Sequence, residues 1–564
     1  MIQAAPITRI TPIAIIAALH ARHPAVGAVI PAEDLEEEAV VEDNNTPEKI
    51  AMKKIFMSMV CLSALSLQGQ TTEDAYRWSQ TSFSGSARYA AMGGAFGAVG
   101  GDFSAFNANP AGSSVFAFSE VGFSLDYSSF ENSTLYKNNR STNEENLLHF
   151  PQGGIVLVLD NTTNGDWSKV AIGLNIERVH NYRQTHAVSG YSQGGIDQYF
   201  LDYAQGRYLG DISILSGENF QEAYRDIGER QGLGYPGQQA LFGYEGFIVN
   251  PIPLADDDDP TNPDIVDYRS NTAGGVNGYR HALFNTHKGG INKFTLNVSS
   301  VFQKKLFIGL NIHTYRLRFQ QQHNFFEDGY SSDSGIRETN FYNRLETNGS
   351  GSSFQLGAIY KLSNALRLGV SLQSPTYYQL NDRIRQVLTV DLNDENNTNL
   401  RLDPETETVF PDYDFRTPGH LRGSLAYVFK DKGLISVDYT SKNYSQMQFT
   451  PADDLFFQSL NQTLNDQFSR TQTWQVGGEF RLNPLFSFRG GFIHESSPIA
   501  LEEHLETTIF STGVGLNFGP STVDIAVVNA QRTNKYRMYD RGLTTPYTLD
   551  KEQFSLQITY RLKL

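Results

Sequence analysis

The chain has 564 residues, a net charge of −16 and one cysteine, Cys61. The acidic balance argues against a nucleic-acid partner, which requires a basic face to neutralise phosphates, and a single cysteine rules out a disulfide framework or a thiolate metal cluster. No run of about 18 apolar residues is present, which argues against membrane helices. The hydropathy of strands with alternating apolar and polar residues averages to an ordinary value, so a transmembrane β-barrel is not excluded.

The first 69 residues predict a signal peptide preceded by an extension. Residues 1–51 are loosely apolar and then acidic. We interpret them as residues added by a start codon that was assigned too early, or as a disordered extension. In residues 52–69, two lysines follow the methionine, and a short apolar stretch leads to Gly69. This order is typical of a cleaved secretory signal peptide, so we expect an exported chain that begins near Gln70.

The stretch from Arg88 to Gly112 is rich in Gly, Ala, Ser and Phe and has almost no charge. It is too apolar for a solvated linker and too rich in glycine for a stable helix or strand. Such a segment folds compactly only when walls surround it, because small residues let backbones approach closely. We therefore predict that residues 70–115 form a hatch inside the structure made by residues 116–564.

After the hatch, the chain becomes a series of segments in which apolar and polar residues alternate, as in a sheet with one polar and one apolar face. Such segments begin near Glu120, Gly154, Lys169, Phe294, Leu306, Ser353, Ala365, His420, Leu434, Thr473, Leu485, Thr508, Thr522 and Gln553. They number about 14, an even count, and each has roughly the 9 to 11 residues of a tilted membrane crossing.

Connection lengths decide between a soluble β-sandwich and a membrane barrel. Every second connection is tight, such as Ser363 to Asn364, while those between are long, such as Pro375 to Pro418. Outer-membrane barrels keep this alternation of short and long connections, and a sandwich has no reason to. The sequence thus predicts an all-β, antiparallel transmembrane barrel with an N-terminal hatch.

The longest connection, residues 183–290, carries an acidic run from Asp256 to Asp259. Carboxylate-rich loops bind hard cations such as calcium, but a solvated charge run is the favoured interpretation. We predict no metal site and no cofactor.

Three stretches carry a resemblance to a known family: AMGGAFGAVGGDFSAFNANPAG in the hatch, LRLGVSLQSP, and EFRLNPLFSFRGGFIHESSP near the end. Together with the signal peptide, they resemble the FadL/TodX-type transporters of long-chain fatty acids and hydrophobic compounds in Gram-negative outer membranes. The resemblance runs from about Gln70 to the C-terminus, and the hatch ending in Asn109, Pro110 and Ala111 is its most specific part.

The resemblance implies a 14-stranded barrel in the outer membrane, closed by the hatch, with a hydrophobic groove between outer loops and an inner pocket. It also implies that the ligand leaves sideways through the wall, beside a kinked third strand. That strand is here residues 169–182, and Gly173 is the favoured kink, because glycine weakens pairing. The predicted partners are thus a long-chain fatty acid or another hydrophobic molecule and the outer-membrane lipid.

A fatty-acid carboxylate needs a cation inside the barrel, and arginine offers a bidentate partner. Arg489, in the best-matching hairpin, is the first candidate for the headgroup contact, followed by Arg422 and Arg367. The alternative for each is a luminal ion pair or a solvated wall residue.

Three aromatic side chains of the hatch are candidates for contact with the acyl chain: Phe96, Phe103 and Phe106. The alternative, which the residues favour, is packing within the hatch.

Three other functions are weighed against passive transport. A haem receptor would use loop histidines, which are scattered and fit surface residues better: His149, His180, His186, His281, His287 and His323. A component of a protein secretion machine, holding secreted proteins with its hatch and loops, would explain the long connection. An outer-membrane lipase is disfavoured because the sequence shows no convincing Ser-His-Asp grouping, so we predict a protein that is not an enzyme.

Overall fold

The computed structural model describes residues 7–9, 70–160, 165–255, 259–394, 399–499 and 505–564. The predicted signal peptide and nearly all of the extension before it lie outside the described residues. The described part of the extension, β1 (Ile7–Arg9), pairs in parallel with β14 (Glu407–Val409).

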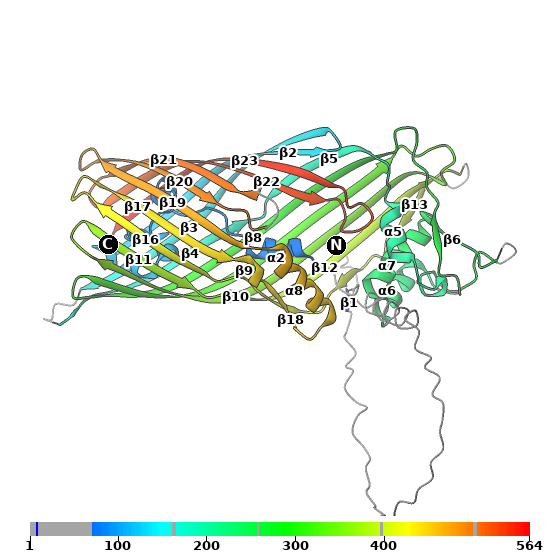
Figure 1. Ribbon diagram of the computed structural model, residues 1–564, viewed down its shortest axis with the longest axis horizontal. Coiled ribbons are helices and arrows are strands. Elements are labelled where there is room, and N and C mark those ends of the chain that lie inside the picture. The colour runs from blue at the N-terminus through cyan, green and yellow to red at the C-terminus, as the bar shows by residue number, and fades with distance from the viewer. Residues whose placement is uncertain (1–6, 10–69, 161–164, 256–258, 395–398, 500–504) are drawn as a thin grey trace, which may run out of the picture.

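Fourteen strands form a closed antiparallel barrel (Figure 1), which confirms the predicted fold class and strand number. Each strand pairs with the next in the ring, and the last pairs with the first. In ring order they are β2 (Glu120–Tyr136), β3 (Asn139–Asp160), β4 (Trp167–Asn181), β8 (Tyr279–Phe302), β9 (Leu306–Asp328), β10 (Ile336–Lys361), β11 (Leu366–Gln373), β16 (His420–Val428), β17 (Gly433–Asn443), β19 (Arg470–Arg481), β20 (Phe486–Glu495), β21 (Thr507–Asn517), β22 (Ser521–Arg537) and β23 (Pro546–Lys563).

The apolar residues of the alternating pattern face outward. On β4, Val170, Ile172 and Leu174 are exposed, whereas Ala171 and Gly173 between them are buried. Exposed apolar side chains recur on the other strands around the barrel, for example Phe123, Leu125, Leu296, Ile308, Leu310, Ile312, Leu356, Leu368, Leu425, Val476, Phe488, Phe510 and Ile558. We call this surface the belt, because it is the surface that the core of a bilayer covers.

The tight connections lie at one end of the barrel and the long ones at the other, which we call the outer end (Figure 1). Several segments predicted as outer loops are strands that continue beyond the belt. β5 (Gln184–Ser192) continues β4 along β8, and β12 (Tyr377–Leu392) pairs with the outer half of β10. Short strands complete this outer wall: β13 (Asn399–Leu402), β15 (Tyr413–Arg416) and β18 (Gln448–Thr450).

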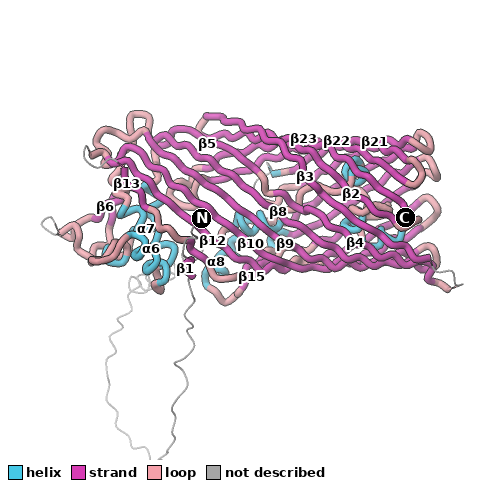
Figure 2. The backbone as a smooth tube through the Cα atoms, turned by 180° about the vertical axis from the view of Figure 1, so that it is seen from behind, coloured by secondary structure: helices cyan, strands magenta, loops and turns pink. Residues whose placement is uncertain are grey.

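The hatch lies inside the barrel at the end with the tight connections (Figure 2). It comprises α3 (Ala87–Ala91), α4 (Ala105–Ala108) and the 3₁₀ helix η1 (Pro110–Val115). The predicted hatch segment, residues 70–115, begins with α2 (Thr72–Ser79), which lies farther toward the outer end. Most of the residues from Ala87 to Val115 are buried, so the walls supply the surroundings that the sequence of this segment requires.

The long connection folds into helices at the outer end: α5 (Asp197–Ala204), η2 (Leu209–Asp211), α6 (Phe220–Glu229) and α7 (Gly234–Glu245), followed by the hairpin of β6 (Val249–Pro251) and β7 (Tyr268–Ser270). We call residues 197–245 the helical cap. Its apolar side chains, among them Phe200 and Phe242, form one core with wall residues such as Phe325, Phe341 and Tyr539. The cap is therefore part of the barrel's own core.

A second helical segment lies at the outer end, in the connection between the short strands β17 and β19. It contains η3 (Tyr444–Gln446) and α8 (Leu455–Gln467), and α8 packs with α2 in a core that includes Trp78 and Phe457. None of the helices in the described part of the chain is long and apolar enough to span a membrane.

Candidate functional site: the hatch and the cavity beside it

The hatch touches the wall at positions where the wall residue is glycine. A Cβ atom added to Gly491 would lie 2.0 Å from the backbone nitrogen of Gly93, and one added to Gly477 would lie 2.2 Å from the carbonyl oxygen of Met92. At Gly369, the added atom would lie 2.2 Å from the carbonyl oxygen of Gly97. The missing side chains thus let hatch and wall meet backbone to backbone.

The predicted motif residues fasten the hatch to the wall. The Asn109 side-chain amide donates to the carbonyl oxygens of Ala358 at 3.0 Å and Val370 at 3.2 Å, both on wall strands. Its Oδ1 accepts a hydrogen bond from the backbone N–H of Ala111 at 3.1 Å. The carbonyl oxygen of Pro110 accepts one from the Asn297 amide at 2.9 Å. In this structure the motif is an anchor of the hatch and does not line the cavity.

The three candidate phenylalanines pack within the hatch and against wall glycines. Phe96, Phe103 and Phe106 are all 0% exposed, and none lines the cavity. The ring of Phe106 fills the space at Gly173, where an added Cβ would lie 2.5 Å from its Cε2 atom. The structure therefore places these rings in hatch packing, the alternative that the residues favoured.

Gly173 is not at an irregular point of the third strand. Its pairing with Val156 on one side and Asn297 on the other is unbroken, and toward the outer end the register shifts only between Arg178 and His180. Because a bulge bends a strand, a kink of β4 is expected at that later position and not at Gly173. Gly173 instead leaves room for the hatch.

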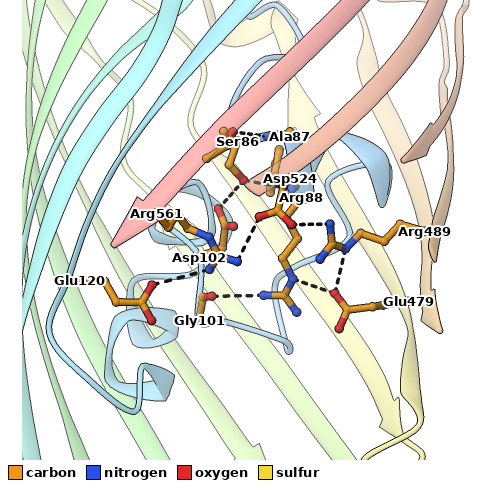
Figure 3. Close-up of polar contacts among 12 residues, drawn as sticks. Ser86, Ala87, Arg88, Gly101, Asp102, Glu120, Glu479, Arg489, Asp524 and Arg561 are labelled. Carbon is orange, nitrogen blue, oxygen red and sulfur yellow. Dashed lines mark hydrogen bonds and ion pairs between the residues drawn. The ribbon is translucent and has the colours of Figure 1, made fainter. Parts of the chain in front are cut away.

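Arg489 belongs to a buried ion-pair network between hatch and wall (Figure 3). Its guanidinium pairs with Glu479 at 2.9 Å and with Asp524 at 2.7 Å. Glu479 also pairs with Arg88 of the hatch at 2.8 Å, and Asp524 with Arg561 at 3.1 Å. Glu479 is thus shared by three arginines, the third being Arg481 at 3.3 Å, and Asp524 by two. Arg489 does not line the cavity. The structure places Arg489 in a luminal ion pair, the alternative to the predicted headgroup contact.

The other two candidate arginines also hold the hatch. Arg367 donates to the carbonyl oxygen of Val99 at 3.2 Å. Arg422 approaches Asp438 at 3.5 Å, and Asp438 accepts a hydrogen bond from the backbone N–H of Gly97 at 2.8 Å. Of the three predicted arginines, only Arg422 lines the cavity.

A cavity of about 1120 Å³ lies on the outer side of the hatch. Hatch residues Phe83, Tyr89 and Asn107 form part of its lining, together with one side of α2. Apolar and aromatic side chains make up much of the rest: Phe130, Val179, Tyr182, Ile291, Tyr315, Tyr378, Tyr444, Phe468, Ile493, Ile509, Val528 and Tyr547. A cavity of this size and lining accepts an elongated apolar ligand.

Three cations in the cavity, which sequence reasoning missed, have no ion-pair partner among the described residues. They are Lys442 on β17, Arg532 on β22 and Lys551 on β23. Arg532 and Lys551 are direct cross-strand partners, an arrangement that is unfavourable for like charges unless an anion lies beside them. Lys442 donates to the hydroxyl of Tyr444 at 3.2 Å. We call these three residues the cavity cations.

The helix α2 brings two opposite charges to the cavity. Arg77 forms an ion pair with Asp74 one turn earlier, and its guanidinium lies 4.5 Å from the ring centre of Phe319. Burial raises the pKa of Glu73 to about 7. The Glu73 side chain keeps accessible surface, but this surface faces the cavity inside the barrel, where burial still disfavours the charged carboxylate.

The barrel wall loses backbone pairing beside the cavity. β3 and β4 pair from Asp160 and Lys169 to Gln152 and Glu177, and no further. Farther out, the ion pair of Arg183 with Glu145 links β3 to the residue before β5. Between these limits, side chains of both strands line the cavity, among them His149, Arg178 and His180. We call this stretch the wall window.

The histidines weighed for haem lie on strands rather than in loops, and most of them point into the barrel. His281 is fully buried, 2.9 Å from Glu327, and His186 lies 3.0 Å from the Tyr547 hydroxyl. The expectation of surface residues is therefore wrong for His186, His281 and His287, because the loops assigned to them are strands. The described residues contain no group of three or more His, Cys, Asp or Glu side chains that could hold a metal ion. Of the acidic run, only Asp259 is described.

Residues 291–561 match the family described as outer membrane protein transport protein (OMPP1/FadL/TodX), and residues 55–137 match an uncharacterised family, UPF0164. No curated protein matches the chain. Among solved structures, a Pseudomonas aeruginosa FadL homologue is 11% identical, with 86% of this chain and 99% of that chain covered and a TM-score of 0.49. The Pseudomonas putida toluene transporter TodX is 13% identical, with 86% and 99% covered and a TM-score of 0.46. Because both scores are below 0.5, the fold rests on the strand pairing.

Proposed function

Since residues 291–561 match the OMPP1/FadL/TodX family of outer-membrane transport proteins, the family that the sequence resembles, we propose that the chain is a passive transporter of long-chain fatty acids or similar anionic amphiphiles. The ligand enters at the outer end, rests in the cavity and leaves sideways through the wall window. The hatch keeps the barrel closed to water-soluble molecules.

The observation that carries this proposal is the charge of the cavity. The whole chain has a net charge of −16. The cavity lining nevertheless includes ten basic side chains, Arg77, Lys137, Arg178, Lys293, Arg422, Lys442, Arg532, Lys535, Arg537 and Lys551, against five acidic ones, Glu73, Asp126, Glu177, Asp466 and Glu495. An excess of cations beside apolar walls suits a ligand with an anionic head and a long apolar tail.

Physical chemistry supports capture without an energy source. Each buried CH₂ group of an acyl chain contributes about 0.8 kcal/mol. The cavity cations supply the partner that the carboxylate needs once it leaves water. A toluene-type hydrocarbon would gain the apolar contacts but would leave these cations unpaired.

The wall window supports a sideways exit. Its side chains line the cavity, and Leu148 and Phe150 on its β3 edge are exposed on the outer face. A ligand that passes between β3 and β4 would return to the membrane without crossing a water-filled pore. The bulge at Arg178 and His180 lies on the opposite edge of the same opening.

Binding measurements with an acid and a matched alcohol test this function. The triple variant Lys442→Met, Arg532→Met, Lys551→Met keeps an extended side chain at each position and removes the charge. We expect its affinity for a long-chain fatty acid to fall by about 10- to 150-fold, because a hydrogen bond to a charged group contributes roughly 1.5–3 kcal/mol. Affinity for the alcohol of the same chain length should change little.

The control replaces three exposed lysines at the tight connections, Lys304, Lys305 and Lys432, by methionine and should bind both ligands as the unmodified protein does. An equal loss for acid and alcohol in the triple variant would contradict the headgroup assignment. Uptake of labelled fatty acid that is unchanged in a strain lacking the protein would contradict the transport function itself.

The secretion alternative depends on the long connection. In the structure, the apolar side chains of the helical cap pack against the barrel's own strands. They are not available as an apolar surface for a secreted protein, so this insertion adds no support to the alternative.

A further inference from the structure

Four cations face outward on neighbouring strands just beyond the belt. They are Lys288 on β8, Arg316 and Arg318 on β9, and Arg383 on β12, and we call them the basic patch. Lys288, Arg316 and Arg318 are exposed, and Arg383 is partly exposed.

The strand register places these residues on the outer face. On β9, Arg316 and Arg318 share the phase of the belt residues Ile308 and Ile312, whereas the alternate residue Leu317 is buried in the interior core. Pairing of Lys288 with Gln320, of Gln320 with Glu346 and of Glu346 with Arg383 sets one row across four strands. The four cations therefore share the outer face of the wall. Glu346, the one acid in this row, pairs with Arg344.

The patch begins at the height of lipid headgroups and extends outward from there, because Lys288 and Arg383 lie in the row of Gln320, eight residues beyond Ile312. Arg316 is four residues beyond Ile312 along β9. A strand rises about 3.3 Å per residue, and at a tilt of about 40° this places Arg316 roughly 10 Å beyond the last apolar side chain of the belt. Long basic side chains reach several ångströms further toward the membrane boundary.

None of the four cations has a carboxylate partner among the described residues, although neighbouring arginines do. Arg344 pairs with Glu346, and Arg385 pairs with Asp403 at 3.0 Å. The Nε atom of Arg383 is shielded from solvent and has no hydrogen-bond partner. The chain as a whole has a net charge of −16, yet these four cations form no ion pair among the described residues. Their arrangement favours the binding of an anion from outside the chain.

The opposite charge occurs beyond the belt elsewhere on the wall. Glu144, Glu131 and Glu552 lie in one row across β3, β2 and β23, and all three are exposed. An anionic headgroup is repelled there and attracted to the basic patch. The outer surface of the barrel is thus divided by charge.

We propose that the basic patch binds the phosphorylated headgroup of an outer-leaflet glycolipid, whose acyl chains lie against the belt of β8, β9 and β10. Guanidinium groups pair with phosphate oxygens in a bidentate manner, and an apolar wall directly below gives the acyl chains their place. Basic side chains next to a membrane surface recognise anionic headgroups in the same way. This binding goes beyond the proposed transport and does not depend on it.

Native mass spectrometry of the purified barrel tests the proposal with lipid A, which carries two phosphates, and with its dephosphorylated form as probes. We expect the unmodified protein to retain the phosphorylated lipid preferentially. The variant Lys288→Gln, Arg316→Gln, Arg318→Gln, Arg383→Gln should lose at least about tenfold of that preference, since each cation near an anionic surface contributes about fivefold.

The matched control Lys304→Gln, Lys305→Gln, Lys430→Gln, Lys432→Gln removes the same charge at the tight connections and should keep the preference. Equal retention by the two variants would overturn the proposal. So would complete displacement of the lipid by excess inorganic phosphate, because the site would then recognise free phosphate. Heat-induced unfolding at the same temperature in both variants shows that the patch variant is folded.

Discussion

Replacing Gly491 by alanine should push the hatch away from the wall. The added Cβ atom would lie 2.0 Å from the Gly93 nitrogen, whereas ordinary contact begins at 3.4 Å. The hatch backbone must therefore retreat by about 1.4 Å, the difference between these distances. Overpacking of this kind costs roughly 1–3 kcal/mol, which raises the population of the displaced hatch by about 5- to 150-fold.

The neighbouring Gly490 provides the control. An atom added there meets nothing within 4 Å, and the residue faces outward on the same strand. Gly490→Ala therefore has the same change of backbone propensity without the clash. The assay is ion conductance of the barrel in a planar bilayer, together with protease cleavage within residues 87–115. Equal conductance and equal cleavage in the two variants would refute the backbone-to-backbone packing of the hatch.

Three further predictions concern the hatch and the cavity. Glu479→Gln should lower the stability of the folded barrel by about 3–5 kcal/mol, because buried Arg88 loses its ion-pair partner and Arg489 keeps only Asp524. The exposed Arg481→Gln removes one solvent-exposed contact to Glu479 and should cost less than about 1 kcal/mol. The loss of the folded band on a gel during heating measures both. Because the pKa of Glu73 is raised to about 7, the folded protein binds an extra proton between pH 4.5 and that value, and stability falls as pH rises through this window. Fatty-acid affinity should also fall as Glu73 ionises, and Glu73→Gln should remove that pH dependence in a titration. Gly173→Ala should loosen the hatch through its contact with Phe106, and the added variant Phe106→Ala should restore protease protection; independent effects of the two substitutions would argue against the contact.

The sequence by itself determined the barrel. Alternation in segments such as Val170 to Ile176 decides which side chains face lipid, because successive residues of a strand point to opposite faces. The short and long connections determine an even strand number, and the composition of Arg88 to Gly112 requires surrounding walls. These are local properties, and the structure bears out the strand number and the fold class.

Only the tertiary structure decided which cations face the cavity. Arg489 and Lys442 both occupy the polar phase of their strands, so alternation cannot separate them. Arg489 lies at the height of the hatch, where Glu479 and Asp524 neutralise it, whereas Lys442 lies beyond the hatch. Lys442, Arg532 and Lys551 all fell in segments that the sequence predicts as long connections, residues 441–470 and 529–551, although their strands continue in the same phase. Height along the barrel follows from register and from where the hatch stops, and both are set by contacts between residues far apart in the chain.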